Sequence, residues 1–395
     1  VIHVILSHGF AIGAFALIVL CEYIGYKRNA PEWEAFARNY IRFTVIVITA
    51  VGAVTGVGIW FYISTLAPRA TGSMLRIFFW PWWIEWFVFV IELVVLLAYY
   101  YLWDKWTGDR KMRHIWLGAS YSFWGFISAF LITGIISFML TSDGWPWSGS
   151  FRQAFFNPSF VPHLLLRLTG ALALGALISL CYLFAIRAKP DFRKEASRLF
   201  GVVLIAGTIA TVIFAWWYFK VVPSAFKSHA MAAVLPKELP KDPALFWAAN
   251  IVGLAIILAL GLTAIRRRTT LARALIIPSA IVGFAFVAEF EYVREFIRGP
   301  YLMPGYMYAN QVLVKESLFF NKAGAGSPRS GQYLFGRNCS SCHTITGINS
   351  IKDRVSGRPE DGIRVILKHT HDLVPWMPPF SGTDQERRVL ARYLF

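Results

Sequence analysis

Charged residues are scarce in this sequence of 395 residues. Asp, Glu, Lys and Arg together make up 15% of it, against about a quarter in an average soluble domain. Hydrophobic residues make up 56%, and the mean hydropathy is +0.52. A soluble globular chain is therefore excluded. Apolar runs long enough to cross a hydrocarbon layer of about 30 Å instead predict an integral membrane protein embedded in a lipid bilayer.

Acidic residues are scarcer than basic ones, which leaves a net charge of +17. Such a charge could indicate a nucleic-acid partner. The basic residues, however, lie in short loops between apolar runs, where the excess of positive charge in cytoplasmic loops would place them. We therefore expect no nucleic acid among the partners.

Cysteine and histidine are also scarce, at four and eight residues. Cys21 and Cys181 lie in apolar runs and are interpreted as buried small apolar side chains. The only histidines in the predicted membrane spans are His3, His8 and His163. A heme–copper oxidase core needs six histidine ligands on membrane helices, so this type of site is excluded.

The apolar runs predict eight membrane helices joined by short linkers. Beyond the eighth span, residues 299–330 carry Gly, Pro and Asn and are predicted to be a linker, and the polar residues 331–395 to be a separate soluble domain. The expected fold is all-α, with a polytopic membrane helix bundle over residues 1–298 and a small soluble helical domain after it. The predicted spans lie near residues 4–26, 43–65, 82–103, 115–140, 162–187, 199–221, 245–265 and 272–297.

The loops between spans differ in positive charge. Seventeen Lys and Arg residues lie in or beside the loops after spans one, three, five and seven, and seven lie in those after spans two, four and six. The richer set is expected in the cytoplasm. The N-terminus is then outside, and an even number of spans returns the C-terminal domain to the same side. The seventeen fall within residues 27–42, 105–113, 187–198 and 266–273, and the seven within 69–76, 220–241 and at Arg152.

One motif in the C-terminal domain is specific. Cys339-Ser-Ser-Cys342-His343 has the C-x-x-C-H spacing of covalent heme attachment. The two thiols reach the two vinyl groups of one heme, and the adjacent imidazole reaches its iron. Met377, in a proline-rich run, is the expected sixth ligand, because a thioether opposite an imidazole suits electron transfer. The sequence thus predicts one covalent heme c in a class I-type cytochrome c domain. The alternative sixth ligands are His369 and His371, which lack the proline frame.

Ionisable residues inside the predicted spans are the next candidates, because their burial in a bilayer is costly and usually functional. Glu85 and Glu92 of the third span are seven residues apart. Seven residues make about two helical turns, so both side chains project from one face. A shared face of carboxylates suits a proton path or a heme ligand.

Histidines and an arginine mark the first and fifth spans. His3 and His8 are separated by about 140° around a helix, so at most one of them is expected to bind a given heme. His163 and Arg167 lie one turn apart on one face of the fifth span. An imidazole at an iron with an arginine at a heme propionate is a plausible pairing there.

The eighth span ends in several charged residues. Glu289 lies deepest and is the best candidate for iron or proton chemistry. Glu291 with Arg294 or Glu295, and Arg294 with Arg298, have the helical-neighbour spacing of a salt-bridged helix end. Glu291 and Arg298 are also candidates for cofactor binding. The case for His229 as a functional residue is weaker, and it is interpreted as a surface residue. His114 lies in a basic loop and is expected to be solvated.

At these positions the sequence resembles subunit I of the cytochrome bd oxidase family. In that family a His on the first helix, a Glu pair on the third, a His on the fifth and a Glu on the eighth surround three hemes. The resemblance covers roughly residues 1–300 and implies heme b, with heme d as an option, near His3 or His8, Glu85, His163 and Glu289. It rests on Ile84-Glu85 through Glu92, on Trp103-Asp104-Lys105, on Asn157-Pro158, and on Glu289 through Arg298-Gly299-Pro300.

The sequence also departs from the family pattern. The loop after the sixth span, about residues 222–244, is short where the quinol enzymes of the family have a long quinol-binding loop. The methionine ligand on the seventh helix is missing, and Asn250 or Val252 stands near its place. A cytochrome c domain follows in place of a ninth helix. The likeness is therefore to a divergent branch whose first subunit ends in a c-type cytochrome.

Together these features predict a cytochrome c-linked, bd-like terminal oxidase subunit. Electrons would enter at heme c from an external donor such as a cytochrome c, and O₂ would be reduced to water with Glu85 and Glu92 carrying protons. The alternative is a non-catalytic, heme-bearing anchor that conducts electrons within a larger respiratory complex. A scaffold without membrane hemes is disfavoured by the buried Glu and Arg residues.

The resemblance also implies partners and a location. A second membrane subunit and other respiratory subunits are expected. The expected location is the bacterial cytoplasmic (inner) membrane, with the N-terminus and the cytochrome c domain on the periplasmic side.

Overall fold

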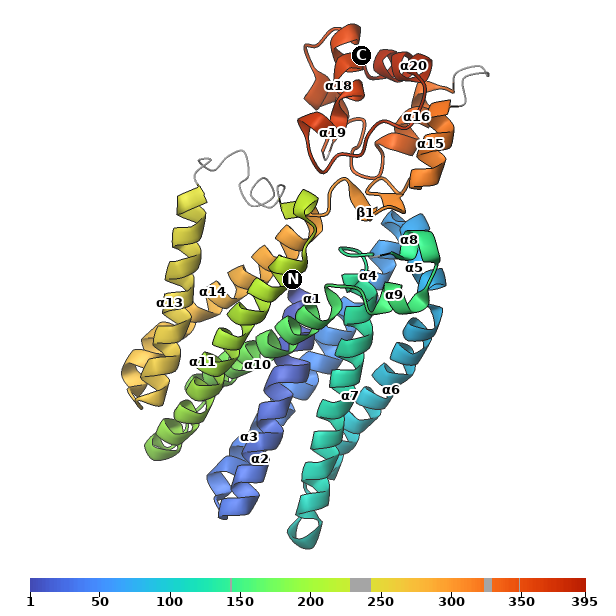
Figure 1. The fold of residues 1–395 in the computed structure, drawn as a ribbon. Helices are drawn as coiled ribbons and strands as arrows, with labels where there is room; N and C mark the ends of the chain where they lie inside the picture. The colour runs from blue at the N-terminus through green and yellow to red at the C-terminus, as the bar shows by residue number, and fades with distance from the viewer. Residues whose placement is uncertain (143, 228–242, 323–328, 348) are drawn as a thin grey trace.

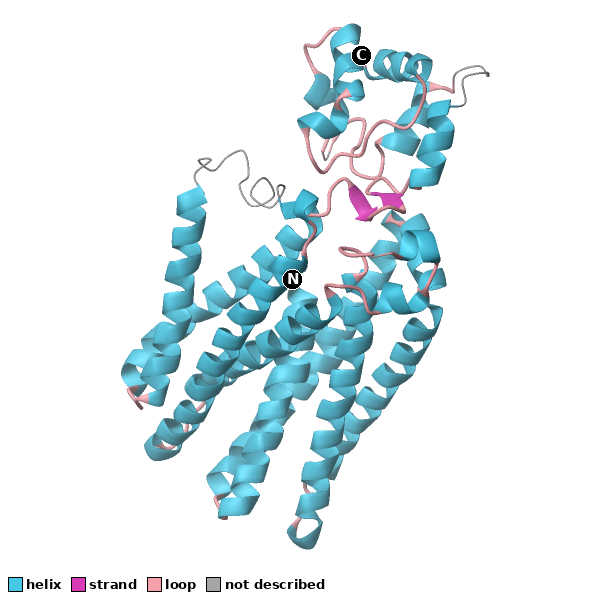
Figure 2. Ribbon diagram, in the orientation of Figure 1, coloured by secondary structure: helices cyan, strands magenta, loops and turns pink. Residues whose placement is uncertain are grey.

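The computed structural model describes residues 1–142, 144–227, 243–322, 329–347 and 349–395. They form a bundle of long helices with a small helical domain at one end (Figure 1). Eight helices in the described residues are long and apolar enough to cross a membrane, which confirms the predicted number of spans. Figure 2 shows that the described residues are helical apart from loops and one pair of short strands.

The first two spans are each assembled from several helical segments. The first consists of α1 (Ile2–Val4), the π-helix η1 (Ile5–Ala14) and α2 (Phe15–Arg28), and the second of α3 (Pro31–Ile46), η2 (Val47–Gly52) and α4 (Ala53–Leu66). The other spans are α6 (Phe79–Leu102), α7 (Lys111–Ser137), α10 (Phe160–Ala185), α11 (Pro190–Val221), α13 (Pro243–Ile265) and α14 (Thr269–Phe296). The short connecting helices are α5 (Pro68–Ile77), η3 (Gly108–Arg110), α8 (Trp145–Ser148) and α9 (Phe151–Phe155).

Local sequence explains several helix boundaries. Pro31 and Pro190 lie at the start of α3 and α11, where the missing N–H group leaves no hydrogen bond unmade. α2 is capped at its C-terminal end by Asn29, which adopts a left-handed conformation with φ 50°. Asparagine tolerates that conformation better than most residues. The first two spans are therefore joined by a very short turn.

The first span packs against α10 backbone to backbone. A Cβ atom added to Gly13 would lie 1.9 Å from the carbonyl oxygen of Ala171, and one added to Gly175 would lie 2.3 Å from the carbonyl carbon of Gly13. Small residues at a helix crossing are typical of membrane bundles, because they let two backbones approach closely. α10 also contacts α7, α11 and α14, so it lies at the centre of the bundle.

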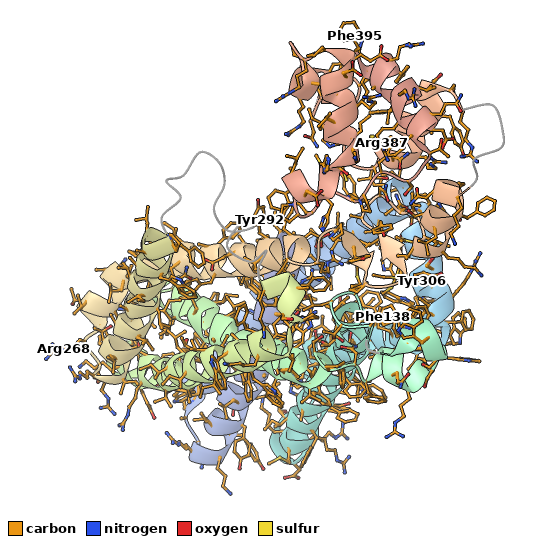
Figure 3. All side chains as sticks on the ribbon, turned by 45° about the horizontal axis from the view of Figure 1, so that its top comes forward. Phe138, Arg268, Tyr292, Tyr306, Arg387 and Phe395 are labelled. Carbon is orange, nitrogen blue, oxygen red and sulfur yellow. The ribbon has the colours of Figure 1, made fainter. Side chains whose placement is uncertain are left out.

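The segment predicted as a linker contains ordered elements. It forms the antiparallel strands β1 (Tyr301–Met303) and β2 (Met307–Tyr308) and the helix α15 (Val314–Lys322). Phe138 and Tyr306, both labelled in Figure 3, each contact the ring of Trp145, at centroid distances of 5.0 and 5.2 Å. The strand pair is thus seated on the end of the bundle.

The C-terminal domain has its own apolar core. Its helices are α16 (Gly331–Asn338), α17 (Ile351–Val355), α18 (Glu360–Lys368), α19 (Thr370–Leu373) and α20 (Asp384–Leu394). Thr383 and Glu386 form a reciprocal capping box at the start of α20. The core is formed by buried side chains of α16, α18 and α20, among them Leu334, Ile363, Leu367, Leu390 and Leu394.

Candidate functional site

The C-x-x-C-H motif begins where α16 ends. The backbone N–H groups of Cys342 and His343 both donate to the carbonyl of Cys339, at 3.1 and 2.9 Å, which folds the motif into one tight turn. The two cysteines are free thiols and are not bonded to each other. Burial raises the pKa of the Cys339 thiol to about 12, so this sulfur is in its neutral form. The arrangement leaves both sulfurs available for thioether bonds, as the motif predicts.

The ring of His343 is oriented by the backbone. Its Nδ1 lies 3.0 Å from the carbonyl oxygen of Asn349, so Nδ1–H donates and Nε2 remains free to bind iron. Burial, and to a smaller extent the nearby Arg354, lower the pKa of His343. Both effects favour the neutral imidazole that a metal requires.

The Met377 loop is held by its neighbours. The backbone N–H of Met377 donates to the carbonyl of Val374 at 2.9 Å, and the Thr370 hydroxyl donates to the carbonyl of Pro378 at 2.9 Å. The alternative ligand His369 is instead paired with Asp372 at 2.9 Å. The residues of this domain therefore fit a covalently bound heme with Met377 as a ligand.

The fifth-span histidine is the clearest candidate in the bundle. His163 is 1% exposed, and neither of its ring nitrogens has a hydrogen-bond partner among the described residues. Leaving a buried polar group unpaired costs about 1–3 kcal/mol. The rings of Tyr218 and Phe290 contact it at centroid distances of 4.9 and 6.0 Å. An unpaired imidazole walled by aromatic rings fits an axial ligand of a heme.

Arg167 contacts His8 directly. Its Nε donates to Nε2 of His8 at 2.8 Å, and Nδ1 of His8 lies 3.0 Å from the Ser7 hydroxyl. The sequence placed Arg167 beside His163 and a propionate, and the structure pairs it with His8 across the close crossing of the first and fifth spans. His8 can therefore offer Nε2 to an iron only when Arg167 releases it.

Two ion pairs close the same end of the bundle. Arg294 binds Glu291 at 2.8 Å, and the buried Arg298 binds Glu295 at 2.5 Å and donates to the carbonyl of Leu302 at 3.2 Å. Arg167 and Tyr218 lie within electrostatic range of this group. The structure thus gathers five residues that the sequence singled out into one cluster, the outer cluster: His8, His163, Arg167, Glu291 and Arg298.

Other candidates have hydrogen-bond partners outside the outer cluster. The Nδ1 atom of His3 lies 3.1 Å from the Thr55 hydroxyl of α4, so His3 and His8 face different partners, as their angular separation predicts. Glu289 faces Asn250 of α13 rather than His163. Of the loop at about residues 222–244, residues 228–242 lie outside the described residues, and with them His229.

Glu85 and Glu92 face α7, on the face that their spacing predicts. The Ser128 hydroxyl donates to Glu85 at 3.3 Å and is also within reach of Glu92. One buried oxygen of the Glu92 carboxylate has no hydrogen-bond partner in the described part of the chain. These carboxylates form a second group, separate from the outer cluster.

The expectation that His114 is a solvated loop residue was wrong. His114 is fully buried in α7, where its Nδ1 lies 2.6 Å from Glu22 and its Nε2 lies 2.8 Å from the carbonyl oxygen of Tyr99. Helix α7 begins at Lys111, so the residue belongs to the helix rather than to the loop before it. His114 is therefore a fourth histidine in a membrane-spanning helix, still short of the six that a heme–copper core needs.

Sequence reasoning also missed Glu22, the only acidic residue of the first span and fully buried. It accepts hydrogen bonds from the Tyr99 hydroxyl at 2.6 Å and is paired with Lys111 at 2.7 Å. A lone carboxylate within an apolar run was the signal that could have identified it.

Two family models and a solved structure are similar to this chain. A family model described as cytochrome bd terminal oxidase subunit I matches residues 1–234, and one described as cytochrome C oxidase, cbb3-type, subunit III, matches residues 326–394. No curated protein matches the chain. The structure of bd oxidase from Geobacillus thermodenitrificans is similar with a TM-score of 0.65 and 18% sequence identity, over 78% of this chain and 88% of that one. At this identity the likeness shows a shared fold.

The first family model covers more than half of the chain and all of the first six spans, including the close crossing that joins His8 to Arg167. The second covers the C-x-x-C-H motif and the Met377 loop. Both imply heme cofactors and electron transfer in a membrane. The chain therefore belongs to the cytochrome bd terminal oxidase subunit I family and ends in a cytochrome c domain.

Proposed function

We propose that the chain is the subunit of a cytochrome c-linked, bd-like oxygen reductase through which electrons enter and O₂ is reduced to water. The observation that supports this most directly is that the Met377 loop packs against the C-terminal end of α14. A Cβ atom added to Gly299 would lie 2.3 Å from Cα of Trp376, and the rings of Phe296 and Trp376 are 5.9 Å apart. The ligand loop of the cytochrome c domain thus adjoins Arg298 of the outer cluster.

Further contacts fix the cytochrome c domain on the bundle. The Ser341 hydroxyl, inside the heme-binding motif, donates to the carbonyl of Asn310 at 3.2 Å. Arg69 binds Glu316 at 2.6 Å. A domain held this way suits electron transfer within the chain, because the entry site and the bundle keep a constant separation.

The proposal assigns roles to the residues. Cys339 and Cys342 hold heme c, with His343 and Met377 at its iron. In the bundle His163 is a ligand, Arg167 and Arg298 offer positive charge to propionates, and Glu291 positions Arg294. When bound, a heme supplies a redox-active iron, and one with an open coordination position binds O₂. The remaining proposed ligands of heme b or d are His3, His8, Glu85 and Glu289.

Glu85 and Glu92 are proposed to hold and pass the protons that O₂ reduction consumes. Their oxygens face Ser128 in the contact between α6 and α7. A carboxylate with an unpaired buried oxygen, as in Glu92, can accept a proton with little rearrangement.

Location and partners follow from charge and exposure. The loop charges favour the bacterial cytoplasmic membrane, with the N-terminus and the cytochrome c domain on the periplasmic side. The second and third spans have only 11% and 17% of their apolar windows buried, which supports contact with lipid and a second membrane subunit. An external redox donor such as a cytochrome c would approach the exposed surface of the C-terminal domain.

Spectroscopy of the purified membrane complex tests the proposal. We expect a reduced heme that binds carbon monoxide and O₂ uptake driven by reduced cytochrome c. If all hemes are six-coordinate and carbon monoxide leaves the spectrum unchanged, the chain is instead an electron conduit within a larger respiratory complex.

A variant tests the role of Glu85 within the same complex. We expect Glu85→Ala to abolish O₂ uptake and to leave the heme c spectrum intact. The control is Glu195→Ala, which removes a half-exposed carboxylate paired with Arg28. Unchanged O₂ uptake in Glu85→Ala would remove Glu85 from the mechanism.

A further inference from the structure

Two antiparallel helices, α6 and α7, carry polar residues in matched seven-residue steps. Seven residues make about two turns, so each set lines one face of its helix. The α6 set is Glu85, Glu92 and Tyr99, and the α7 set is Ser128, Tyr121 and His114.

The two sets pair in order along the contact between the helices. Ser128 donates to Glu85 at 3.3 Å, and Tyr121 lies within electrostatic range of Glu92. At the last step the ring of His114 stacks on Tyr99 with centroids 4.3 Å apart. A polar ladder therefore runs along two apolar helices, from the proposed proton carriers toward the end of the bundle where α6 ends and α7 begins.

The ladder ends at a buried carboxylate. Glu22 of α2 has no exposed surface, and it accepts from the Tyr99 hydroxyl at 2.6 Å and is paired with His114 at 2.6 Å and Lys111 at 2.7 Å. A carboxylate that accepts charge-assisted hydrogen bonds from several donors is stabilised in its ionised form. It therefore stays charged at rest, and a proton that reaches its oxygens is held only briefly before it moves to a neighbouring group.

A surface residue connects this carboxylate to solvent. Lys111 is itself buried, but its ammonium group lies 3.5 Å from Glu34, whose side chain is 37% exposed. The network lies at the end of the bundle opposite the cytochrome c domain (Figure 1). That end carries the positively charged loops.

We propose that Glu22, with Lys111, His114 and Tyr99, is the portal through which protons enter the bundle on their way to Glu92. The inference rests on the proposed function, because O₂ reduction is the reaction that would consume these protons. Lys111 passes a proton to the Glu22 carboxylate and regains one from solvent by way of the Glu34 carboxylate. The Tyr99 hydroxyl turns away from Glu22 and gives its proton to a water molecule on the side of Tyr121, and the Tyr99 oxygen takes the proton from Glu22 in its place.

The aromatic ring of Phe15 lies between the portal and the next step of the ladder, at Tyr121. The ring of Phe15, fully buried, lies 5.1 Å from that of Tyr99 and 4.0 Å from that of Tyr121. A proton passes this ring only through a water molecule or with movement of the ring. The ring keeps the portal from leaking protons when the hemes are not being reduced.

The groups that face Glu22 set the pH dependence of entry. They are Tyr99 of α6, Lys111 and His114 of α7, and Glu34 of α3 through Lys111. The neighbouring pair of Arg38 and Asp104, 2.5 Å apart, closes the same end of the bundle.

The experiment measures proton uptake without O₂. The complex is reconstituted in vesicles so that the end of the bundle with the positively charged loops faces a pH-sensitive dye. Proton uptake is followed as the membrane hemes are reduced. We expect Glu22→Gln to slow uptake on the order of 100-fold, the low end of what a positioned proton-transfer group contributes. Tyr99→Phe, which keeps the ring on His114, should slow it as well and serves if Glu22→Gln fails to assemble.

The control is Glu32→Gln, because Glu32 lies on α3 like Glu34 but is paired with Lys189 at the surface. Its uptake should match the unmodified protein. If both Glu22→Gln and Tyr99→Phe take up protons at the normal rate and unfold at a lower temperature, the network only stabilises the fold. That result would overturn the proposed portal. A complex that takes up protons on reduction but never consumes O₂ would overturn the proposed function and leave the portal standing.

Discussion

At the scale of single residues, His163 carries most of the case for a heme in the bundle. A fully buried imidazole with both nitrogens unpaired is costly without a ligand, since each lost hydrogen bond costs about 1–3 kcal/mol. Its walls are the aromatic rings of Tyr218 and Phe290. Arg167, one turn deeper, is already engaged by His8.

His163→Ala is expected to remove one membrane heme and leave heme c in place. The reason is that no other imidazole among the described residues lies in contact with Tyr218 and Phe290. The measurement is the heme content of the purified complex by pyridine hemochrome spectra. His369→Ala is the control, because His369 is paired with Asp372 at the surface of the C-terminal domain. A full heme complement in His163→Ala would exclude His163 as a ligand.

Met377→His is expected to lower the reduction potential of heme c. A thioether opposite imidazole raises the potential of a heme, and axial ligands together span about 0.8 V. We therefore expect a fall on the order of 0.1 V, read by a potentiometric titration of the heme c absorbance. An unchanged potential would point to another sixth ligand.

At the scale of elements, the crossing of the first span and α10 sets the outer cluster. Gly13 and Gly175 bring the two backbones into contact. About one helical turn further along, the same approach lets Arg167 reach His8 at 2.8 Å. The geometry of the site thus depends on two residues that have no side chain.

Gly13→Val is expected to destabilise the bundle by about 1–3 kcal/mol, the usual cost of overpacking. Its Cβ would lie 1.9 Å from the carbonyl oxygen of Ala171, so the helices must separate. The midpoint of thermal unfolding in detergent measures the change, and loss of the His8–Arg167 contact should alter the membrane heme spectrum. Gly58→Val on α4 is the matched control, since a Cβ there has no neighbour within 4 Å. Equal midpoints for the two variants would contradict the packing argument.

At the scale of the whole molecule, the cytochrome c domain is packed against the membrane bundle. The strand pair and α15 join it to the bundle, and Trp376 of the ligand loop rests on Gly299. The proposed electron entry site and the outer cluster therefore lie on the same end of the bundle, while the proposed portal around Glu22 lies on the other (Figure 1). Electrons and protons would approach the buried hemes from opposite sides.

Gly299→Val is expected to slow electron transfer from heme c to the membrane hemes. Its added atoms would collide with the backbone of Trp376 and lift the loop from α14. Flash photolysis of the carbon monoxide complex follows this transfer directly, while the heme c potential reports whether the loop itself stays intact. Gly336→Ala in α16 is the control, because a Cβ there meets nothing within 4 Å. Transfer at the normal rate would show that this contact is not part of the electron route.

The sequence alone determined the eight spans, the separate C-terminal domain and the heme-attachment motif. These features depend on local properties: apolar length, turn residues, and the fixed spacing of Cys339, Cys342 and His343. The shared face of Glu85 and Glu92 was also predictable, because it needs only the helical repeat.

Only the tertiary structure decided which distant residues meet. The contact of Arg167 with His8, the seat of Trp376 on Gly299, and the burial of His114 against Glu22 join segments far apart in the chain. His114 illustrates the physical reason. Its neighbours in sequence are basic and suggest solvent. Its environment is instead set by α2, which supplies a carboxylate, and by α6 with the residue after it, which supply a carbonyl and two aromatic rings.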